Sequence, residues 1–291
     1  MLIPIKYHKR TYPEHIIPEI QEVAGHFDIR ELSSTGKFSL HTEYSYGKRK
    51  LDSNLIKEFP AITTHHKKRV PQLWFSKQWA EEFSDFITAL CQENQPVIIE
   101  IHPPFSDYTK SIDHFLDIYT RFEETILTKY PDTLLFIENR CGTMYSGGKF
   151  LLTTVDDVVE LNNSLANRQL KLKITLDFPQ LLTSYRGPQH IQEKKMVCLL
   201  DGLLPCQESI TGIHLWGKKR NKKGRLIAHQ GDLNTYFEDK NKKSAFLIWL
   251  KKFLSDGKTR YFVPEVNGSD ENLHSIIYDL ESVDIIFQTN K

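Results

Sequence analysis

The stretch Thr133–Gly142, TLLFIENRCG, decides the fold of this chain. Thr133 and the apolar run Leu134–Ile137 have the composition of a buried strand, and the run passes directly into Glu138. Parallel strands buried on both faces are continuously apolar, so a carboxylate at the end of such a strand lies where the core meets solvent. Ligands bind at this edge of the sheet in α/β proteins. Glu138 is therefore the reference point for a functional site.

Five other strand-like segments also end in a residue type that binds metals: Ala61–His66, Val97–His102, Leu172–Asp177, Ile210–His214 and Tyr261–Glu265. Between His66 and His214 the terminal residues follow one another at intervals of 36 to 39 residues. This is about the length of one strand plus its crossover helix. The sequence therefore predicts an α/β fold, a (β/α)₈ TIM barrel formed by residues 1–291 as one domain, with these side chains converging on one rim.

Weaker patterns predict the remaining elements. Leu2–Lys6 and Phe27–Leu32 would be the first two strands, the second with Glu31 near its end. Residues 217–231 form a basic insertion after the seventh strand. Helical spacing of apolar residues predicts helices over Pro13–Gly25, Leu51–Phe59, Ser76–Glu93, Ser111–Tyr130, from about Thr154, and over Gln189–Leu204, Ser244–Leu254 and Glu271–Glu281.

The composition is that of a soluble globular protein. A formal net charge of +1 argues against a generally polyanion-binding surface, so any basic feature must be local. The four cysteines show no CxxC spacing, which favours reduced thiols. We find neither a signal peptide nor an apolar run near the ~20 residues that a membrane span needs. We therefore expect a cytoplasmic protein without a membrane partner.

Ligand-type residues at six matched strand ends indicate a metal site. Barrel closure brings the C-terminal ends of the strands together, so Glu138, Asp177 and Glu265 would repel one another. A divalent cation relieves this repulsion, and a salt-bridge network with lysine and arginine is the alternative. Carboxylates and imidazoles suit zinc, manganese or non-haem iron. We expect one or two divalent ions, zinc or manganese.

The number of ions depends on which residues take part. One ion would require the set Glu138, Asp177, His214 and Glu265. With His66 and His102 on neighbouring strands, Glu138 would bridge to a second ion, an arrangement that activates water for phosphoryl displacement. Because side chains alternate along a strand, the register leaves open whether His65 or His66 points inward.

Several motifs resemble those of the xylose isomerase-like TIM barrels, which include endonuclease IV and the sugar isomerases and epimerases. The resemblance extends over nearly the whole chain in order and spacing, and rests on ENRCG at 138–142, HLWG at 214–217, HQGDL at 229–233, Asp177 and Glu265. The endonuclease branch implies three zinc ions. The first would be held by His66, His102 and Glu138, and the second by Glu138, Asp177, His214 and Glu265.

The chain departs from the endonuclease pattern at the third zinc. Gln180 occupies the position of a histidine, and Ile227 occupies that of an aspartate before His229. The resemblance therefore implies two metals, with His229 as a substrate-binding or accessory group. The isomerase and epimerase branch implies a single metal. In that case Glu138 and Glu265 would exchange a proton with the substrate while His102 or His229 orients its hydroxyls.

Two basic segments would lie on the rim beside this site. Phosphate contacts would come from Lys67, Lys68 and Arg69 on one side and from Lys218, Lys219 and Arg220 on the other. Trp74 and Trp216 are near enough in sequence to stack bases, and Arg140 and Gln180 are further substrate-binding candidates. A solvated lysine-rich loop is the alternative interpretation, and a phosphorylated sugar would suit the same cations.

Three functional hypotheses follow. The first is a divalent-metal phosphodiesterase or nuclease of the endonuclease IV type, in which a metal-bound hydroxide attacks the phosphodiester. Its catalytic residues would be Glu138, Glu265, His102 and His229. The second is a single-metal sugar or sugar phosphate isomerase or epimerase. The third is a barrel-based binding protein with a vestigial metal site, because Gln180 and Ile227 interrupt the ligand pattern.

Overall fold

The computed structural model describes residues 1–27, 29, 32, 36–42, 53–67, 70–145 and 148–288. Eight parallel strands form a closed barrel, as the sequence predicts, in the order β1-β14-β11-β10-β7-β6-β3-β2. The strands are β1 (Leu2–Lys6), β2 (Ile20–Gly25), β3 (Phe38–Thr42), β6 (Ile98–Ile101), β7 (Leu134–Glu138), β10 (Lys173–Asp177), β11 (Ile210–Leu215) and β14 (Arg260–Pro264). The fold is a single-domain TIM barrel.

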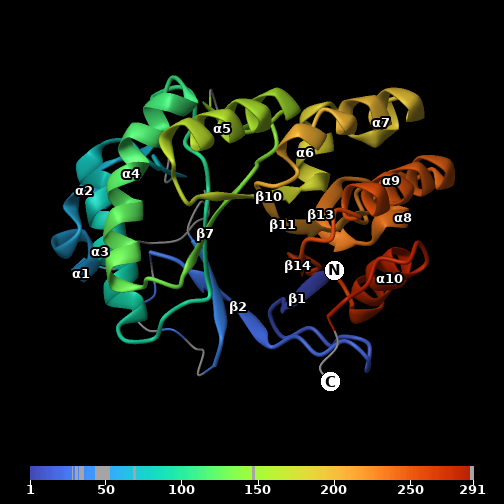
Figure 1. Cartoon of the computed structure of the whole chain (residues 1–291), viewed down its shortest axis with the longest axis horizontal. Coiled ribbons are helices and arrows are strands. Elements are labelled where there is room, and N and C mark those ends of the chain that lie inside the picture. The colour runs from blue at the N-terminus through green and yellow to red at the C-terminus, as the bar shows by residue number, and fades with distance from the viewer. Residues whose placement is uncertain are drawn as a thin grey trace.

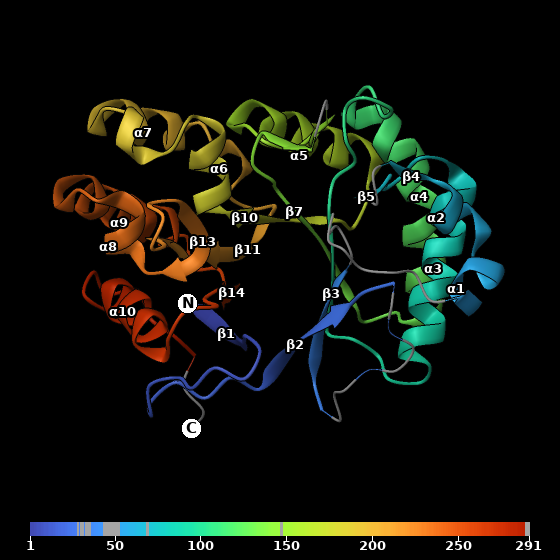
Figure 2. The same cartoon turned by 180° about the vertical axis from the view of Figure 1, so that it is seen from behind.

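Helices surround most of this barrel. They are α1 (Ser53–Glu58), α2 (Pro60–Thr64), α3 (Lys77–Cys91), α4 (Ile112–Lys129), α5 (Val155–Arg168), α6 (Phe178–Ser184), α7 (Glu193–Asp201), α8 (Leu233–Phe237), α9 (Lys240–Phe253) and α10 (Asp270–Glu281). Figures 1 and 2 show α10 beside β1, whereas no helix of the described residues lies beside β2. The connection 7–19, which is described throughout, covers this side instead, with Tyr12 and Ile16 buried.

The barrel interior has an apolar floor and a polar upper layer. Outward-facing residues of the strands pack against the helices, whereas Ile20, Ile98, Phe136 and Val263 form a separate inner cluster. Each of these four residues is followed two positions later by a buried glutamate. These are, in the same order, Glu22, Glu100, Glu138 and Glu265. Side chains two apart in a strand share a face, so these carboxylates lie directly above the apolar floor.

Three helices begin where the sequence predicts, each at an N-terminal cap. The hydroxyl groups of Ser76, Ser111 and Thr154 each accept a hydrogen bond from the backbone N–H three residues later. This satisfies a donor that the first helical turn leaves unpaired and fixes where α3, α4 and α5 begin.

The predicted helix over Pro13–Gly25 is wrong, because Ile20–Gly25 forms β2. Strand β2 hydrogen-bonds to β1 on one side and β3 on the other, which outweighs the helical spacing of its apolar residues. The predicted second strand, Phe27–Leu32, is wrong for its described members, Phe27, Ile29 and Leu32. Phe27 packs against Phe83 and Phe86 of α3, and Glu31 lies outside the described residues.

The predicted third strand, Ala61–His66, is also wrong. Pro60–Thr64 is helix α2, which begins at a proline suited to a first helical turn. The Glu82 carboxylate accepts hydrogen bonds from the backbone N–H groups of Ala61 and Ile62 and so stabilises that turn. His66 lies in the two-residue strand β4 (His66–Lys67), which pairs with β5 (Val70–Pro71) outside the barrel. The third barrel strand is β3.

Two further hairpins follow barrel strands. The basic insertion forms an antiparallel pair, β12 (Gly217–Arg220) and β13 (Leu226–Gly231), and the loop after β7 contains β8 (Thr143–Tyr145) and β9 (Gly148–Lys149). All four cysteines are free, and Cys91 and Cys206 are buried. Within the described part of the chain, no helix combines the length and the apolar character that a membrane crossing requires.

Candidate metal centre

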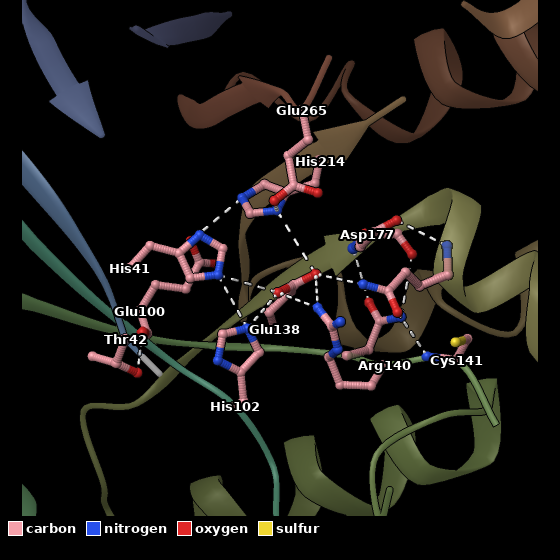
Figure 3. Close-up of polar contacts among 12 residues, drawn as sticks. His41, Thr42, Glu100, His102, Glu138, Arg140, Cys141, Asp177, His214 and Glu265 are labelled. Atoms are coloured by element: carbon pink, nitrogen blue, oxygen red, sulfur yellow. Dashed lines mark hydrogen bonds and ion pairs between the residues drawn. The ribbon is translucent and has the colours of Figure 1, made fainter. Parts of the chain in front are cut away.

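Glu138 lies at the centre of the site, at the C-terminal end of β7, and is fully buried. Figure 3 shows its carboxylate between two groups of imidazoles and acids. Arg140 donates from one guanidinium nitrogen to both oxygens at 3.1 and 3.0 Å, and Gln180 donates from Nε2 to Oε1 at 3.1 Å. Nε2 of His102 lies 2.8 Å from Oε2. The Glu138 carboxylate thus contacts three other side chains of the site.

The first donor set consists of His41, His102 and Glu138. The His41 and His102 rings are stacked with centroids 4.9 Å apart, and their Nε2 atoms are 3.1 Å apart. Nε2 of His41 also lies 3.6 Å from Oε2 of Glu138. Two imidazole nitrogens and one carboxylate oxygen therefore converge on the same space.

The second donor set consists of Glu138, Asp177, His214 and Glu265, which are all buried and whose ligand atoms lie within 4.8 Å of one another. Nδ1 of His214 is 3.5 Å from Oε1 of Glu265 and 3.9 Å from Oε1 of Glu138. Asp177 is held by hydrogen bonds from Nε1 of Trp216 and the backbone N–H of Gln180. Oε2 of Glu265 is buried and accepts no hydrogen bond from the described residues.

These donors fit a divalent ion. Each set combines imidazole nitrogen with carboxylate oxygen, the mixture that zinc and manganese accept. Oε2 of Glu265 supports the assignment, because a buried carboxylate oxygen that accepts no hydrogen bond is costly and a cation would satisfy it. Glu138 belongs to both sets, so two ions would share its carboxylate.

The carboxylates of the cluster respond differently to their surroundings. Burial alone would raise the pKa of Glu138, but the Arg140 charge and the contacts with His102 and His41 hold that pKa well below its ordinary value. Burial is opposed in the same way at Glu265, where the neighbouring His214 lowers the pKa to about 2. Burial and repulsion by Glu138 and Glu265 raise the pKa of Asp177 well above its ordinary value.

The histidines fall into two classes. Burial tends to lower the pKa of His41 and His214, but the surrounding carboxylates outweigh it and raise both pKa values well above the ordinary value. Burial dominates at His102, whose pKa falls to about 4, and it also lowers the pKa of His229. In the metal-free protein at neutral pH, His41 and His214 therefore carry the positive charge, while His102 and His229 are neutral.

The structure brings together five of the six predicted metal-ligand residues: His102, Glu138, Asp177, His214 and Glu265. His66 lies on β4, outside the barrel, and its side chain is not described. His41, which the sequence pattern does not indicate, lies beside His102 and Glu138. The strand that contains His41 has no continuous apolar run, so the sequence pattern does not identify it as a buried strand. The regular interval of 36 residues before His102 instead selects His66 as the metal ligand.

The predicted substrate-binding residues occupy varied positions. Trp216 is buried and orients Asp177, whereas Trp74 is in the core and donates to the backbone of His102. Nζ of Lys218 turns inward to Thr183 at 2.9 Å and lies over the Trp216 and Tyr236 rings. Lys219 and Arg220 are exposed on β12. Lys67 has no described side chain, and Lys68 and Arg69 lie outside the described residues.

A cavity of about 270 Å³ opens beside the cluster on the side of β1 to β3. His41 and Glu265 line it together with His229. Nδ1 of His229 lies 3.1 Å from the backbone oxygen of Glu265 and 3.5 Å from its Oε2, and the ring is 4.2 Å from that of Trp216. The predicted accessory histidine therefore lies between the donor cluster and open space.

The fold and the site together define a TIM barrel with a histidine and carboxylate cluster at the C-terminal ends of its strands. Neither a protein-family model nor a curated protein matches the sequence. Among solved structures, the AsfvAP:AG crystal structure is similar with a TM-score of 0.53 and 12% identity, over 85% of this chain and 86% of that one.

Two xylose isomerase domain proteins also have similar structures. The one from Planctomyces limnophilus has a TM-score of 0.45 and 12% identity, over 84% of this chain and 76% of its own. The one from Alicyclobacillus acidocaldarius has a TM-score of 0.43 and 9% identity, over 85% and 77%. At these identities the comparisons bear on the fold alone, and the similarity to the AsfvAP:AG structure over most of both chains agrees with the closed barrel described above.

Proposed function

We propose that this protein is a divalent-metal-dependent phosphodiesterase or nuclease. One observation carries the proposal: Glu138 belongs to both donor sets, so its carboxylate would bridge two cations. Divalent ions held in this way would activate a water molecule and neutralise the oxygens of a phosphodiester. The two other donors of the first set come from β3 and the end of β6. The three other donors of the second set come from β10, β11 and the end of β14, on the opposite side of β7 in the barrel order, so each ion has its own ligands.

The residues of this chain would have distinct roles in that reaction. His41, His102 and Glu138 would hold one ion, and Glu138, Asp177, His214 and Glu265 the other. His66, the ligand expected from sequence, has no barrel strand to place it there. His229 is neutral at pH 7 and borders the cavity, so it is placed to accept a proton. Arg140 would orient a phosphate oxygen once an ion replaces it at Glu138.

Nucleic acid is the proposed substrate class. The exposed cations of the β12–β13 hairpin, Lys219, Arg220, Lys222, Lys223 and Arg225, follow β11, the strand that carries His214. Such a hairpin at the mouth of the site would neutralise several consecutive phosphates. A sugar phosphate carries a single phosphate group and would need fewer of these cations.

The test is metal content together with phosphodiester cleavage. We expect two zinc or manganese equivalents per chain and metal-dependent cleavage of bis-p-nitrophenyl phosphate and of DNA. Glu138→Gln should lose both equivalents and all cleavage, because each donor set depends on this carboxylate. Glu123→Gln is the matched control, since Glu123 is also buried but lies on α4 and binds Tyr119 and the backbone before β10. Metal-loaded protein that cleaves neither substrate would contradict the proposal.

A second candidate is the single-metal sugar isomerase or epimerase. Arg140 already places one cation against both oxygens of Glu138, which favours a single ion beside it. This activity would exchange a substrate C–H proton with solvent, using Glu138 and Glu265 as acid and base. One metal equivalent and deuterium incorporation into a sugar would favour it over hydrolysis. Nucleic-acid binding that survives chelation, without turnover, would favour the binding protein.

A further inference from the structure

Two buried carboxylates beside the metal centre belong to neither of the two donor sets. Glu22 on β2 is 7% exposed and Glu100 on β6 is 3% exposed. Both point into the barrel, one step above the apolar floor formed by Ile20 and Ile98. The sequence pattern indicates neither, because Glu22 falls in a predicted helix and Glu100 lies inside an apolar strand.

Glu22 contacts the far side of the His41 ring. Oε1 of Glu22 lies 2.7 Å from Nδ1 of His41. The other ring nitrogen, Nε2, faces the first donor set, 3.1 Å from His102 and 3.6 Å from Glu138. The His41 ring thus lies between the Glu22 carboxylate and the other two members of the first donor set.

Glu100 faces the His214 ring in a similar way, at a longer distance and with the two ring nitrogens exchanged. Oε2 of Glu100 lies 3.4 Å from Nε2 of His214. Nδ1 of His214 faces Glu265 and Glu138. The second oxygen, Oε1 of Glu100, is buried and accepts no hydrogen bond within the described chain, so this carboxylate has no competing donor there.

A neutral imidazole has one N–H and one lone pair, and a partner at one nitrogen decides which nitrogen carries the proton. A carboxylate accepts only, so it favours an N–H facing it and a lone pair on the opposite nitrogen when no other carboxylate competes there. At His214 the Glu265 carboxylate competes, 3.5 Å from Nδ1, until a cation binds Glu265. For His41 the lone pair would then lie on Nε2, and for His214 on Nδ1. In both cases this is the nitrogen that faces the donor set.

We propose that Glu22 and Glu100 are positioning residues that hold His41 as the Nδ1–H tautomer and His214 as the Nε2–H tautomer, so that each ring presents its other nitrogen to a divalent cation. The inference rests on the metal centre of the proposed function. It also excludes a direct ligand role for Glu22, although Glu22, His41 and Glu265 are close enough to form a third donor set. Nδ1 of His41 cannot both donate to Glu22 and bind an ion.

Zinc titration of the full chain against a competing chelator tests the effect on binding. Glu22→Ala and Glu100→Ala should each weaken zinc binding about 10- to 100-fold, the usual effect of removing such a partner. The number of ions bound at saturation should not change. Glu22→Gln should recover part of the lost affinity, because its amide oxygen still accepts from Nδ1–H. Glu123→Ala serves as the control for loss of a buried carboxylate elsewhere.

¹⁵N NMR of the histidine rings tests the tautomers directly. In the metal-free protein in alkaline buffer, where the rings are neutral, we expect protonated Nδ1 in His41. In His214, where Glu265 also faces Nδ1, we expect a larger share of protonated Nε2 than in Glu100→Ala. Glu22→Ala should produce a tautomer mixture in His41, and Glu22→Gln should retain its single tautomer. Variants His41→Asn and His214→Asn assign the signals.

Three results would overturn the inference: the opposite tautomers, unchanged zinc affinity in both alanine variants, or the loss of one bound equivalent at saturation in Glu22→Ala. The last result would make Glu22 a ligand. Failure of the proposed function would give a different result. The protein would then bind zinc and show the expected tautomers but would not cleave phosphodiesters, and the positioning roles of Glu22 and Glu100 would still hold. If no zinc binds, the metal-free tautomers still decide the inference.

Discussion

Arg140 and a divalent ion compete for the same carboxylate. Arg140 is 5% exposed, and its guanidinium donates to both oxygens of Glu138, where a cation shared by the two donor sets would bind. An arginine charge cannot be removed by deprotonation, so it must move aside or repel the ion. The same contact stabilises the metal-free protein, because Glu138 would otherwise be an uncompensated buried charge.

Arg140→Met should therefore have opposite effects on binding and stability. We expect zinc affinity to rise roughly tenfold or more, the equivalent of about 1.4 kcal/mol. The metal-free variant should lose about 3–5 kcal/mol of stability, as when one partner of a buried ion pair is removed. Chelator competition measures the first effect and urea unfolding in chelator the second.

The matched control for Arg140→Met is Arg168→Met. Arg168 forms ion pairs with Asp113 and Asp117, but these pairs are at the surface and should contribute less than about 1 kcal/mol. A fall in zinc affinity in Arg140→Met would show that the guanidinium assists the metal centre instead of competing with it.

At the scale of elements, the sequence predicts strands well where both faces are apolar. β7, β10 and β11 are apolar runs that end at Glu138, Asp177 and near His214, and the structure contains all three. β2 and β3 cannot be recognised in this way because their inward residues, such as Glu22 and His41, are polar. A strand whose inner face serves the site resembles neither a buried strand nor an amphipathic one.

The β12–β13 hairpin separates the two proposed substrate classes. Replacing its exposed cations Lys219, Arg220, Lys222, Lys223 and Arg225 with serine should weaken DNA binding and flatten its salt dependence, by roughly 0.9 in slope for each phosphate that is no longer neutralised. Lys218 stays, because it binds Thr183 inside the site. Metal content should not change, since none of the five side chains belongs to the cluster. Fluorescence anisotropy at several salt concentrations measures the slope.

The control for the hairpin variant replaces cations elsewhere on the surface: Lys194, Lys195, Lys240, Lys251 and Lys252. This control removes the same net charge, but its five lysines lie on α7 and α9. If both five-residue variants bind DNA equally, the hairpin is a solvated loop without a specific role in substrate binding.

The whole molecule encloses a set of charges whose balance depends on pH. The pKa values of His41 and His214 lie above their ordinary value of 6.5, so the folded state binds protons more tightly than the unfolded chain. Their contribution to stability is fully present below pH 6.5 and is lost as pH rises through the raised folded pKa values. Glu265 contributes above its ordinary pKa of 4.5, and this is lost as pH falls toward 2.

We therefore expect the Tm of the metal-free protein to fall as the pH rises above 6.5. Zinc should raise Tm by an increment that grows over the same range, because the ion replaces the protons that the histidines lose. At a zinc concentration 100 times Kd the stabilisation would be about 2.7 kcal/mol. Differential scanning fluorimetry with zinc and with chelator measures both curves. An increment that shrinks as the pH rises would contradict this account.

The closure of the barrel has a consequence for folding kinetics. Leu2 of β1 pairs with Arg260 of β14, and the backbone of Gln288 donates to Leu2. Pairing over such a sequence separation is intrinsically slow, and it cannot occur on the ribosome until β14 has been translated. The order of synthesis separates the two donor sets: His41, His102 and Glu138 emerge early, and Glu265 emerges last. The second cation position is therefore completed only when the nascent chain closes on itself.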